Sequence, residues 1–133
     1  TVRTPGSQLM PPGVRAVFDP GDRGDFLLVV GNLSSGAVTR TVSDALEDQT
    51  DETFRVESFG LIPGEGWVLP DIRRSDHATF WDAGLPAVLL TDTANFRSRH
   101  YHRTSDRLET LDLEFLAAVA RGVEQAVRDL ATP

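Results

Sequence analysis

Two short apolar runs that contain no charge constrain the fold of this chain more than any other feature. Residues 26–30 read Phe-Leu-Leu-Val-Val and are followed by Gly31-Asn32, and residues 85–91 read Leu-Pro-Ala-Val-Leu-Leu-Thr. Such runs predict strands that are covered on both faces, and we expect residues 85–91 to be the central strand of a sheet. Residues 54–58 instead carry a charge at every second position, which predicts a half-exposed strand at the sheet edge.

Helical patterns occur after the first strand and at the end of the chain. Ser34 or Ser35 is in position to cap a helix, because apolar residues recur at helical spacing after it: Val38, Val42, Ala45 and Leu46. The final segment carries the clearest helical pattern, with Asp112 as its expected N-cap. We expect the apolar stripe of this last helix to pack on the sheet through six residues: Leu113, Leu116, Ala120, Val123, Val127 and Leu130.

A short helix is also predicted just before the run at 85–91. Ser75 is a suitable N-cap, and Phe80 and Trp81 are expected to supply the buried side of this helix. The helix is expected to run through Ala83, where Gly84 provides a left-handed stop.

Strands separated by helices indicate an α/β layer architecture with a mostly parallel central sheet flanked by helices. The length of 133 residues suits one domain, so we expect residues 1–133 to form a single domain or the C-terminal portion of a larger one. Residues 1–24 hold four of the eight prolines, which predicts an irregular connecting segment. Because the first residues lack an initiator methionine and a signal-peptide core, we expect the chain to be cut from something longer.

The charge balance argues against two classes of partner. Thirteen basic and twenty acidic residues give a net charge of -7, which opposes binding to nucleic acid and to an anionic membrane surface. The absence of cysteine excludes disulfides, thiolate zinc sites and a cysteine nucleophile. No apolar run reaches the ~18 residues of a membrane span. Secreted and cytoplasmic locations both remain open.

All three histidines lie close to the predicted strand at 85–91. His77 precedes it, while His100 and His102 follow it and flank Tyr101. In an extended backbone the imidazoles of His100 and His102 would face the same way and could chelate zinc together. In a loop their directions are unconstrained, and a hydrogen-bonded loop histidine is the alternative to a metal ligand.

The sequence Ser75-Asp76-His77 contains the three members of a hydrolytic triad, but its geometry excludes one. Consecutive residues at a helix start diverge by about 100° each, whereas triad side chains must converge on one point. No glycine-flanked nucleophile elbow is present either. We therefore expect Asp76 to be a carboxylate that is stabilised by the helix dipole or that supports a neighbouring site.

Two further features have a structural and a functional interpretation. Four arginines surround the later histidines, Arg97, Arg99, Arg103 and Arg107. An anion site is one interpretation, but we expect solvent exposure or pairing with Asp106 and Glu109. Trp67, in a loop rich in glycine and proline, either lines a cleft or caps the core, and capping is the favoured interpretation.

Several motifs within residues 73–112 together resemble one known family. They are Arg-Arg-Ser-Asp-His-Ala-Thr-Phe-Trp at 73–81, Ala-Gly-Leu-Pro-Ala-Val-Leu-Leu-Thr-Asp-Thr at 83–93, His-Tyr-His-Arg-Thr-Ser-Asp at 100–106 and Thr-Leu-Asp at 110–112. In order and spacing they resemble the C-terminal half of the zinc aminopeptidase family of co-catalytic metallopeptidases. Looser similarity extends from Asp22 into the final helix.

The resemblance implies a fold, an activity and roles for particular residues. The implied fold is a three-layer zinc-exopeptidase architecture, and the implied activity is release of N-terminal residues from a peptide substrate. Such peptidases use two zinc ions to polarise the scissile carbonyl and to generate hydroxide at neutral pH. By resemblance His102 is a zinc ligand, and Tyr101 is a catalytic residue whose phenol hydrogen-bonds the tetrahedral intermediate. Asp76 and His77 would be supporting residues below the site.

The family also needs residues that this sequence does not display. They are an upstream histidine, a bridging aspartate, a Glu-Glu pair that supplies the general base and a ligand, and a further acidic ligand. In the family they precede the matched part, so we expect an isolated chain to be inactive. We also expect its exposed surface to bind either the missing N-terminal half or a second copy of the chain. The alternative is a non-catalytic peptidase-like binding module.

Overall fold

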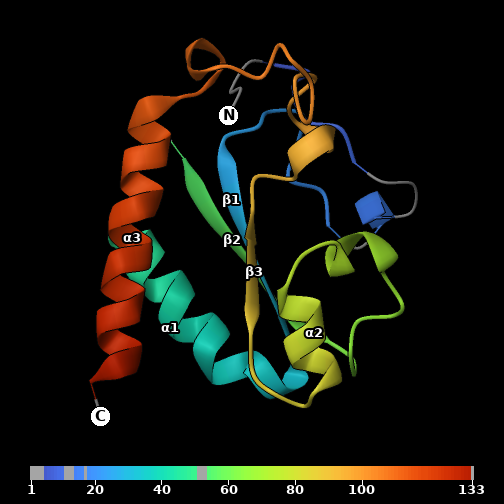
Figure 1. Cartoon of the computed structure of the whole chain (residues 1–133), viewed down its shortest axis with the longest axis vertical. Coiled ribbons are helices and arrows are strands. Elements are labelled where there is room, and N and C mark those ends of the chain that lie inside the picture. The colour runs from blue at the N-terminus through green and yellow to red at the C-terminus, as the bar shows by residue number, and fades with distance from the viewer. Residues whose placement is uncertain (1–4, 11–13, 17, 51–53, 133) are drawn as a thin grey trace.

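A three-stranded sheet forms the centre of the molecule, as seen in a computed structural model that describes residues 5–10, 14–16, 18–50 and 54–132 (Figure 1). The strands are β1 (Phe26–Asn32), β2 (Arg55–Ile62) and β3 (Val88–Thr91), in the spatial order β2-β1-β3. The helices are α1 (Gly36–Glu47), α2 (His77–Asp82) and α3 (Leu113–Ala131). Short 3₁₀ helices lie at Val14–Ala16, Leu33–Ser35, Pro70–Arg73, Ala94–Phe96 and Leu108–Thr110.

Strand β1 is the buried centre of the fold because successive side chains point to opposite faces of a sheet. Leu27 and Val29 face α1 and α3 and belong to the larger apolar cluster. Val30 packs on the other face in a second cluster with Ile62 and Trp81. Helices therefore lie on both faces of the sheet, which confirms the α/β class (Figure 1).

The expected arrangement of the strands is wrong in two respects. The sheet is mixed and not mostly parallel, because β1 pairs with β2 in parallel but with β3 in antiparallel orientation. Strand β3 lies at an edge of this sheet and is not its centre, and all four of its residues are only partly buried. An apolar run predicts burial, but it cannot reveal strand order or direction, which depend on contacts far apart in the sequence.

Helix α1 forms where the periodicity predicts it. Val42, Ala45 and Leu46 are buried, and Ser35 occupies the N-cap position. The hydroxyl of Ser35 makes no capping bond, since it donates to the Asn32 side chain and accepts a 3.0 Å hydrogen bond from the Ala87 amide. Ser35 thus ties the start of α1 to the segment that leads into β3.

Helix α2 differs from its prediction at its start. Asp76 and not Ser75 occupies the N-cap position, and the helix begins at His77 without a side-chain cap. Trp81 is buried as expected, but Phe80 is 49% exposed. Gly84 has a φ of 72°, which confirms the left-handed stop.

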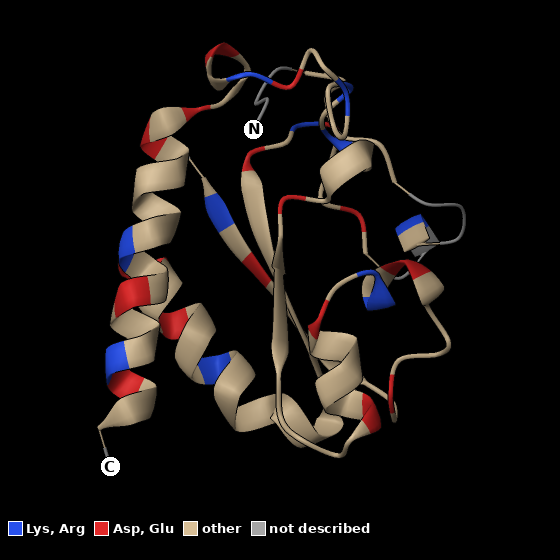
Figure 2. Cartoon of the chain, in the orientation of Figure 1, with Lys and Arg blue, Asp and Glu red and all other residues tan. Residues whose placement is uncertain are grey.

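Helix α3 begins as expected but buries a different face. The side chain of Asp112 accepts a 3.0 Å hydrogen bond from the Phe115 amide, which confirms the N-cap. The buried side consists of smaller residues and one aromatic: Phe115, Ala118, Gly122 and Ala126. The expected stripe is largely exposed, with Leu113, Leu116, Val127 and Leu130 each 48–60% accessible. Charged residues of both signs also lie along this helix (Figure 2).

Close approach to α1 explains this choice of face. A Cβ atom on Gly122 would lie 2.7 Å from Leu46 Cδ2 and 3.0 Å from Leu46 Cα, so only glycine fits at the contact. Small residues let two helices approach closely, whereas the long side chains of the leucine stripe would hold them apart.

The first 24 residues largely lack regular structure where they are described, as predicted, but they are not a detached connection. The Leu9 amide donates to the Phe96 carbonyl at 2.7 Å, and the Gln8 amide donates to the Asp22 carbonyl at 3.0 Å. Residues 1–4, 11–13 and 17 of this segment lie outside the described residues. Among the described residues, no helix is long and apolar enough to cross a membrane.

Candidate active site

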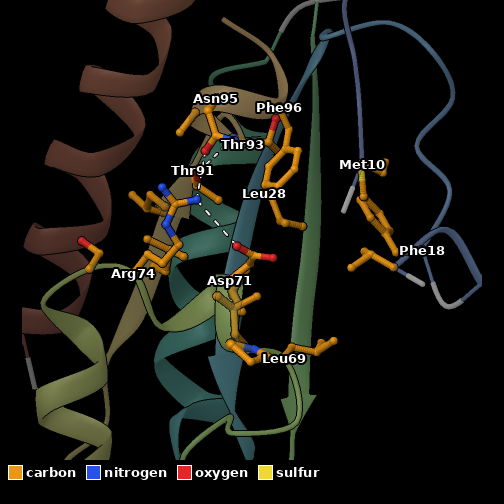
Figure 3. A pocket seen from close by; sticks show the side chains of 18 of the residues that line it. Met10, Phe18, Leu28, Leu69, Asp71, Arg74, Thr91, Thr93, Asn95 and Phe96 are labelled. Atoms are coloured by element: carbon orange, nitrogen blue, oxygen red, sulfur yellow. Dashed lines mark hydrogen bonds and ion pairs between the residues drawn. The ribbon is translucent and has the colours of Figure 1, made fainter. Parts of the chain in front are cut away.

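A pocket of about 420 Å³ lies on the α2 side of the sheet (Figure 3). Its floor comes from β1 and β3, and its walls come from Met10, Val14 and Phe18 and from the loops before α2 and after β3. The apolar side chains that line the pocket include Met10, Val14, Phe18, Leu28, Leu89 and Phe96. A cavity of this size and composition suits an apolar side chain or a small molecule.

Polar side chains occupy one part of this pocket. The Arg74 guanidinium donates from Nη1 to Asn95 Oδ1 at 2.9 Å and lies 3.6 Å from Asp71 Oδ1 (Figure 3). These contacts connect the segment before α2 with the loop that follows β3. Arg74 is half exposed, so solvent reaches this polar part of the site.

A buried arginine anchors the loop that follows β3. Arg97 is 4% exposed and donates from Nε to Gln8 Oε1 at 2.9 Å and from Nη1 to the Phe26 carbonyl at 2.7 Å. Burial lowers the pKa of Arg97 to about 10, against the opposing effect of the carboxylates of Asp92 and Asp25. The guanidinium therefore remains charged at neutral pH and joins this loop to the first strand and to the N-terminal segment.

The backbone of the same loop adopts unusual conformations. Thr93 and Ala94 have φ values of 71° and 48°, and Asp92 Oδ1 accepts a 3.0 Å hydrogen bond from the Ala94 amide. Gln8 Nε2 donates to Thr93 Oγ1 at 2.9 Å. Left-handed conformations at residues other than glycine persist only where surrounding contacts hold them, and they concentrate at functional sites.

Tyr101 and His102 lie on a tight turn further along this loop. The Tyr101 amide donates to the Ser98 carbonyl at 3.2 Å, and the Arg103 amide donates to the His100 carbonyl at 2.9 Å. His102 is left-handed with a φ of 56°, and its ring stacks on that of Tyr101 at 4.0 Å between centroids. Tyr101 is half-buried and lines the pocket, while His102 is exposed.

The two loop histidines have different surroundings. His100 Nδ1 lies 3.0 Å from Ser105 Oγ, and Arg99 Nε lies 3.4 Å from His100 Nε2. The His102 ring has no hydrogen bond to any described residue, so its nitrogens are available to a ligand. The backbone turns at His102 and is not extended there. Joint chelation of zinc by His100 and His102 was expected only for an extended backbone, so the structure does not meet this condition.

Asp76 and His77, which were expected to support the site, lie at the start of α2 and do not line the pocket, although the adjacent Ser75 does. Asp76 is exposed, whereas His77 is 6% exposed and packs edge-on against Trp81 at 4.6 Å. Burial lowers the pKa of His77, and Arg73 adds to this effect; the Ile72 backbone and the Asp76 carboxylate oppose it. His77 is therefore largely a neutral core residue at neutral pH.

Trp67 neither caps the core nor lines the pocket. It is 67% exposed, and the Arg73 guanidinium lies 3.7 Å from the centre of its ring. The same guanidinium forms a 2.7 Å ion pair with Asp82. The favoured core-capping interpretation of Trp67 is therefore wrong.

The pocket also contains residues for which no role was predicted from the sequence. Met10 and Phe18 come from the segment expected to be only a connection, and Gln8 from that segment binds Arg97. A signal was present, since apolar side chains recur in this proline-rich stretch at Leu9, Met10, Val14 and Phe18. Within the described residues, no group of three or more histidine, cysteine, aspartate or glutamate side chains could hold a metal ion.

Comparison with known proteins identifies the family. Residues 26–127, which include β1, α2, the Tyr101-His102 turn and most of α3, match Peptidase family M28. The chain belongs to this family. The M28 chain is 36% identical over 120 residues to the uncharacterized protein YfbL of Escherichia coli strain K12.

The similarity to YfbL covers only part of that protein. The aligned region covers 90% of the M28 chain but 35% of YfbL, so the chain spans about a third of this curated relative. No solved structure matches the M28 chain significantly. Membership of the family supports a peptidase-like domain.

Proposed function

We propose that this M28 chain is the C-terminal part of a zinc-dependent exopeptidase that releases N-terminal residues from peptides by metal-activated water. The observation that carries the proposal is the Tyr101-His102 pair. An exposed imidazole without a hydrogen-bond partner among the described residues stacks on a phenol ring that lines the pocket. Both residues lie within the range that matches the peptidase family.

Tyr101 is suited to stabilise developing negative charge. Attack of water on a peptide carbonyl places negative charge on the carbonyl oxygen, and a preorganised hydroxyl donor lowers the energy of that state. The turn at Ser98–Tyr101 fixes the backbone that carries Tyr101, and the phenol ring stacks on the His102 ring. The adjoining pocket would receive an apolar side chain of the substrate and fix the scissile bond beside Tyr101.

The residues of the chain fit part of a zinc site and not a whole one. His102 offers an exposed imidazole, a common zinc ligand, but the described residues contain no group of three candidate ligands. We therefore derive no catalytic step through the metal. In our proposal His102 supplies one ligand, another part of a longer polypeptide supplies the rest, and the isolated chain is inactive.

A second candidate function is a non-catalytic binding module. The absence of a grouped ligand set from the described residues favours it, and the pocket would serve such a module equally well. The two candidates differ in turnover, because only the first predicts release of amino acids from a bound peptide.

The role of Tyr101 is tested by Tyr101→Phe in the complete protein that carries this chain. Loss of one donor to an oxyanion typically lowers kcat by about 10²–10³, so we expect a fall of that size with little change in KM. Trp67→Phe, which changes an exposed aromatic that does not line the pocket, is the matched control and should leave both constants unchanged. An unchanged kcat in Tyr101→Phe would exclude the proposed role, and absence of any peptide hydrolysis by the zinc-loaded wild type would favour the binding module.

A further inference from the structure

The loop that carries Tyr101 and His102 also carries three exposed arginines that have no acidic partner. Among the described residues, no carboxylate lies within 4 Å of the guanidinium of Arg99, Arg103 or Arg107, although Asp106 and Glu109 belong to the same loop. Elsewhere in the described part of the chain, ion pairs involve five arginines: Arg15, Arg55, Arg73, Arg74 and Arg128. Solvent exposure of the loop arginines agrees with expectation, but pairing with Asp106 and Glu109 does not occur.

The loop is ordered without use of these charges. Successive turns are closed by backbone hydrogen bonds from Arg103 to His100, from Asp106 to Arg103 and from Thr110 to Arg107, each 2.9 Å long. A further contact of 3.0 Å joins the side chains of His100 and Ser105. The three guanidinium groups are thus carried on a defined backbone, and none of them forms an ion pair with a described carboxylate; Arg99 Nε has only the 3.4 Å contact with His100 Nε2.

The arginines lie close to the candidate catalytic residue. Arg99 and Arg103 are each two positions from Tyr101, so their Cα atoms lie within about 7 Å of that of Tyr101. Tyr101 itself lines the pocket. None of the three arginines lines the pocket, but a peptide with one side chain in it would pass the backbone that carries Arg99 and Arg103.

The segment around Tyr101 carries net positive charge, whereas the chain as a whole is negatively charged. Residues 97–107 contain four arginines and one aspartate, a formal charge of +3 that includes the buried Arg97, whereas the whole chain carries -7. Figure 2 shows both basic and acidic segments along this loop at the top of the view. A local field opposite in sign to the remainder of the surface selects ligands by charge complementarity, and arginine can bind carboxylates through two parallel hydrogen bonds.

We propose that Arg99, Arg103 and Arg107 form a recognition surface for acidic peptides beside the Tyr101 pocket. The inference rests on the proposed function and adds a substrate class to it, namely peptides that carry aspartate or glutamate near the residue held in the pocket. The acidic remainder of the chain would disfavour such peptides at other places on its surface.

The test compares binding of two fluorescent decapeptides by anisotropy. Both begin with leucine, and one carries three glutamates where the other carries three lysines. The loop variant is Arg99→Gln/Arg103→Gln/Arg107→Gln, and the matched control is Arg40→Gln/Arg121→Gln/Arg128→Gln on α1 and α3. Each variant replaces three arginines and moves the formal charge from -7 to -10; the control differs in the position of the lost charges and in removing the exposed ion pair between Arg128 and Glu124.

We expect the wild-type chain at low salt to bind the acidic peptide about tenfold more tightly than the basic one. The loop variant should lose this preference, and the helix control should retain most of it. No preference in the wild type, or an equal loss in both variants, would overturn the proposal, since the latter would indicate an effect of net charge alone.

Failure of this proposal can be distinguished from failure of the proposed function. The binding assay needs neither zinc nor turnover, so a preference for the acidic peptide that depends on the loop supports the recognition surface even if the complete protein hydrolyses nothing. Conversely, hydrolysis of acidic and neutral peptides at equal kcat/KM by the complete protein would support the peptidase and overturn the recognition surface.

Discussion

At the scale of single residues, burial separates the three histidines into different chemical types. His77 is enclosed beside Trp81, His100 contacts Ser105 and Arg99, and His102 is exposed and stacked on Tyr101. Only His102 combines exposure with ring nitrogens that are unused among the described residues. Environment, and not residue type, therefore makes His102 the best candidate for a ligand.

The burial of His77 predicts a dependence of stability on pH. Its pKa in the fold is lowered from 6.5, so between these two values the unfolded chain binds more protons than the folded one. The contribution of His77 to the free energy of unfolding is therefore complete above pH 6.5 and decreases as the pH falls below it. Urea denaturation of the wild type and of His77→Phe above and below this pH measures the effect.

We expect the loss of stability on acidification to be smaller in His77→Phe than in the wild type. His100→Gln is the control, because that residue lies in the loop outside the core, and its pH dependence should match that of the wild type. Equal dependence on pH in His77→Phe and the wild type would show that His77 does not titrate on unfolding.

Local sequence was informative for residues whose role depends on near neighbours. The Asp112 cap and the Gly84 stop follow from short-range backbone geometry, and the structure confirms both. The contact between Arg97 and Gln8 spans 89 positions, and no local pattern marks it. The proposed roles of Tyr101 and His102 come from resemblance and stay predictions.

At the scale of elements, α3 shows why an apolar stripe alone does not identify a buried face. The structure buries the row that contains Gly122, because this row allows close contact with Leu46 of α1. The alternative row has larger apolar side chains and remains largely exposed. Helix existence and length could be predicted from periodicity, but the choice between two apolar rows depends on the shape of the partner helix.

Gly122→Ala should destabilise the chain even though alanine favours helix formation. The new Cβ atom would meet Leu46 Cδ2 at 2.7 Å and Leu46 Cα at 3.0 Å, and the backbone atom cannot move aside easily. Overpacking typically costs 1–3 kcal/mol and exceeds the propensity gain of about 1 kcal/mol, so we expect a net loss of about 1 kcal/mol in the free energy of unfolding.

Gly36→Ala is the matched control for this substitution. Gly36 has a φ of -56° at the start of α1, and a Cβ atom there would meet nothing within 4 Å. Chemical denaturation should show unchanged or slightly raised stability for Gly36→Ala. Equal stability of the two variants would contradict the close contact between α1 and α3.

At the scale of the whole molecule, the fold leaves apolar surface without cover. Strand β3 lies at an edge of the sheet, with its four residues only partly buried. Leu116 and Val127 of α3 are 51% and 60% exposed. Exposed apolar rows and open strand edges favour association, either with another part of a longer polypeptide or with a second copy of the chain. The α/β class could be predicted from sequence, but the mixed sheet and its open edge required the pairing of distant strands.

We expect the isolated 133-residue chain to self-associate through this surface. Leu116→Gln/Val127→Gln should shift sedimentation toward the monomer, because it removes apolar area from the exposed row of α3. Leu61→Gln, which changes a 77% exposed residue on β2, should leave association unchanged. A monomeric wild-type chain at all concentrations would contradict the prediction.

The role of His102 as one ligand of a zinc site completed elsewhere is tested most directly by calorimetric titration of Zn²⁺. The titration compares the isolated chain with the complete protein that carries it, each also as His102→Ala and as the matched control His100→Ala. We expect no appreciable stoichiometric binding by the isolated chain. In the complete protein we expect tight binding that His102→Ala weakens by at least about 100-fold and that His100→Ala leaves largely intact. Tight binding by the isolated chain, or binding by the complete protein that His102→Ala does not change, would contradict this role.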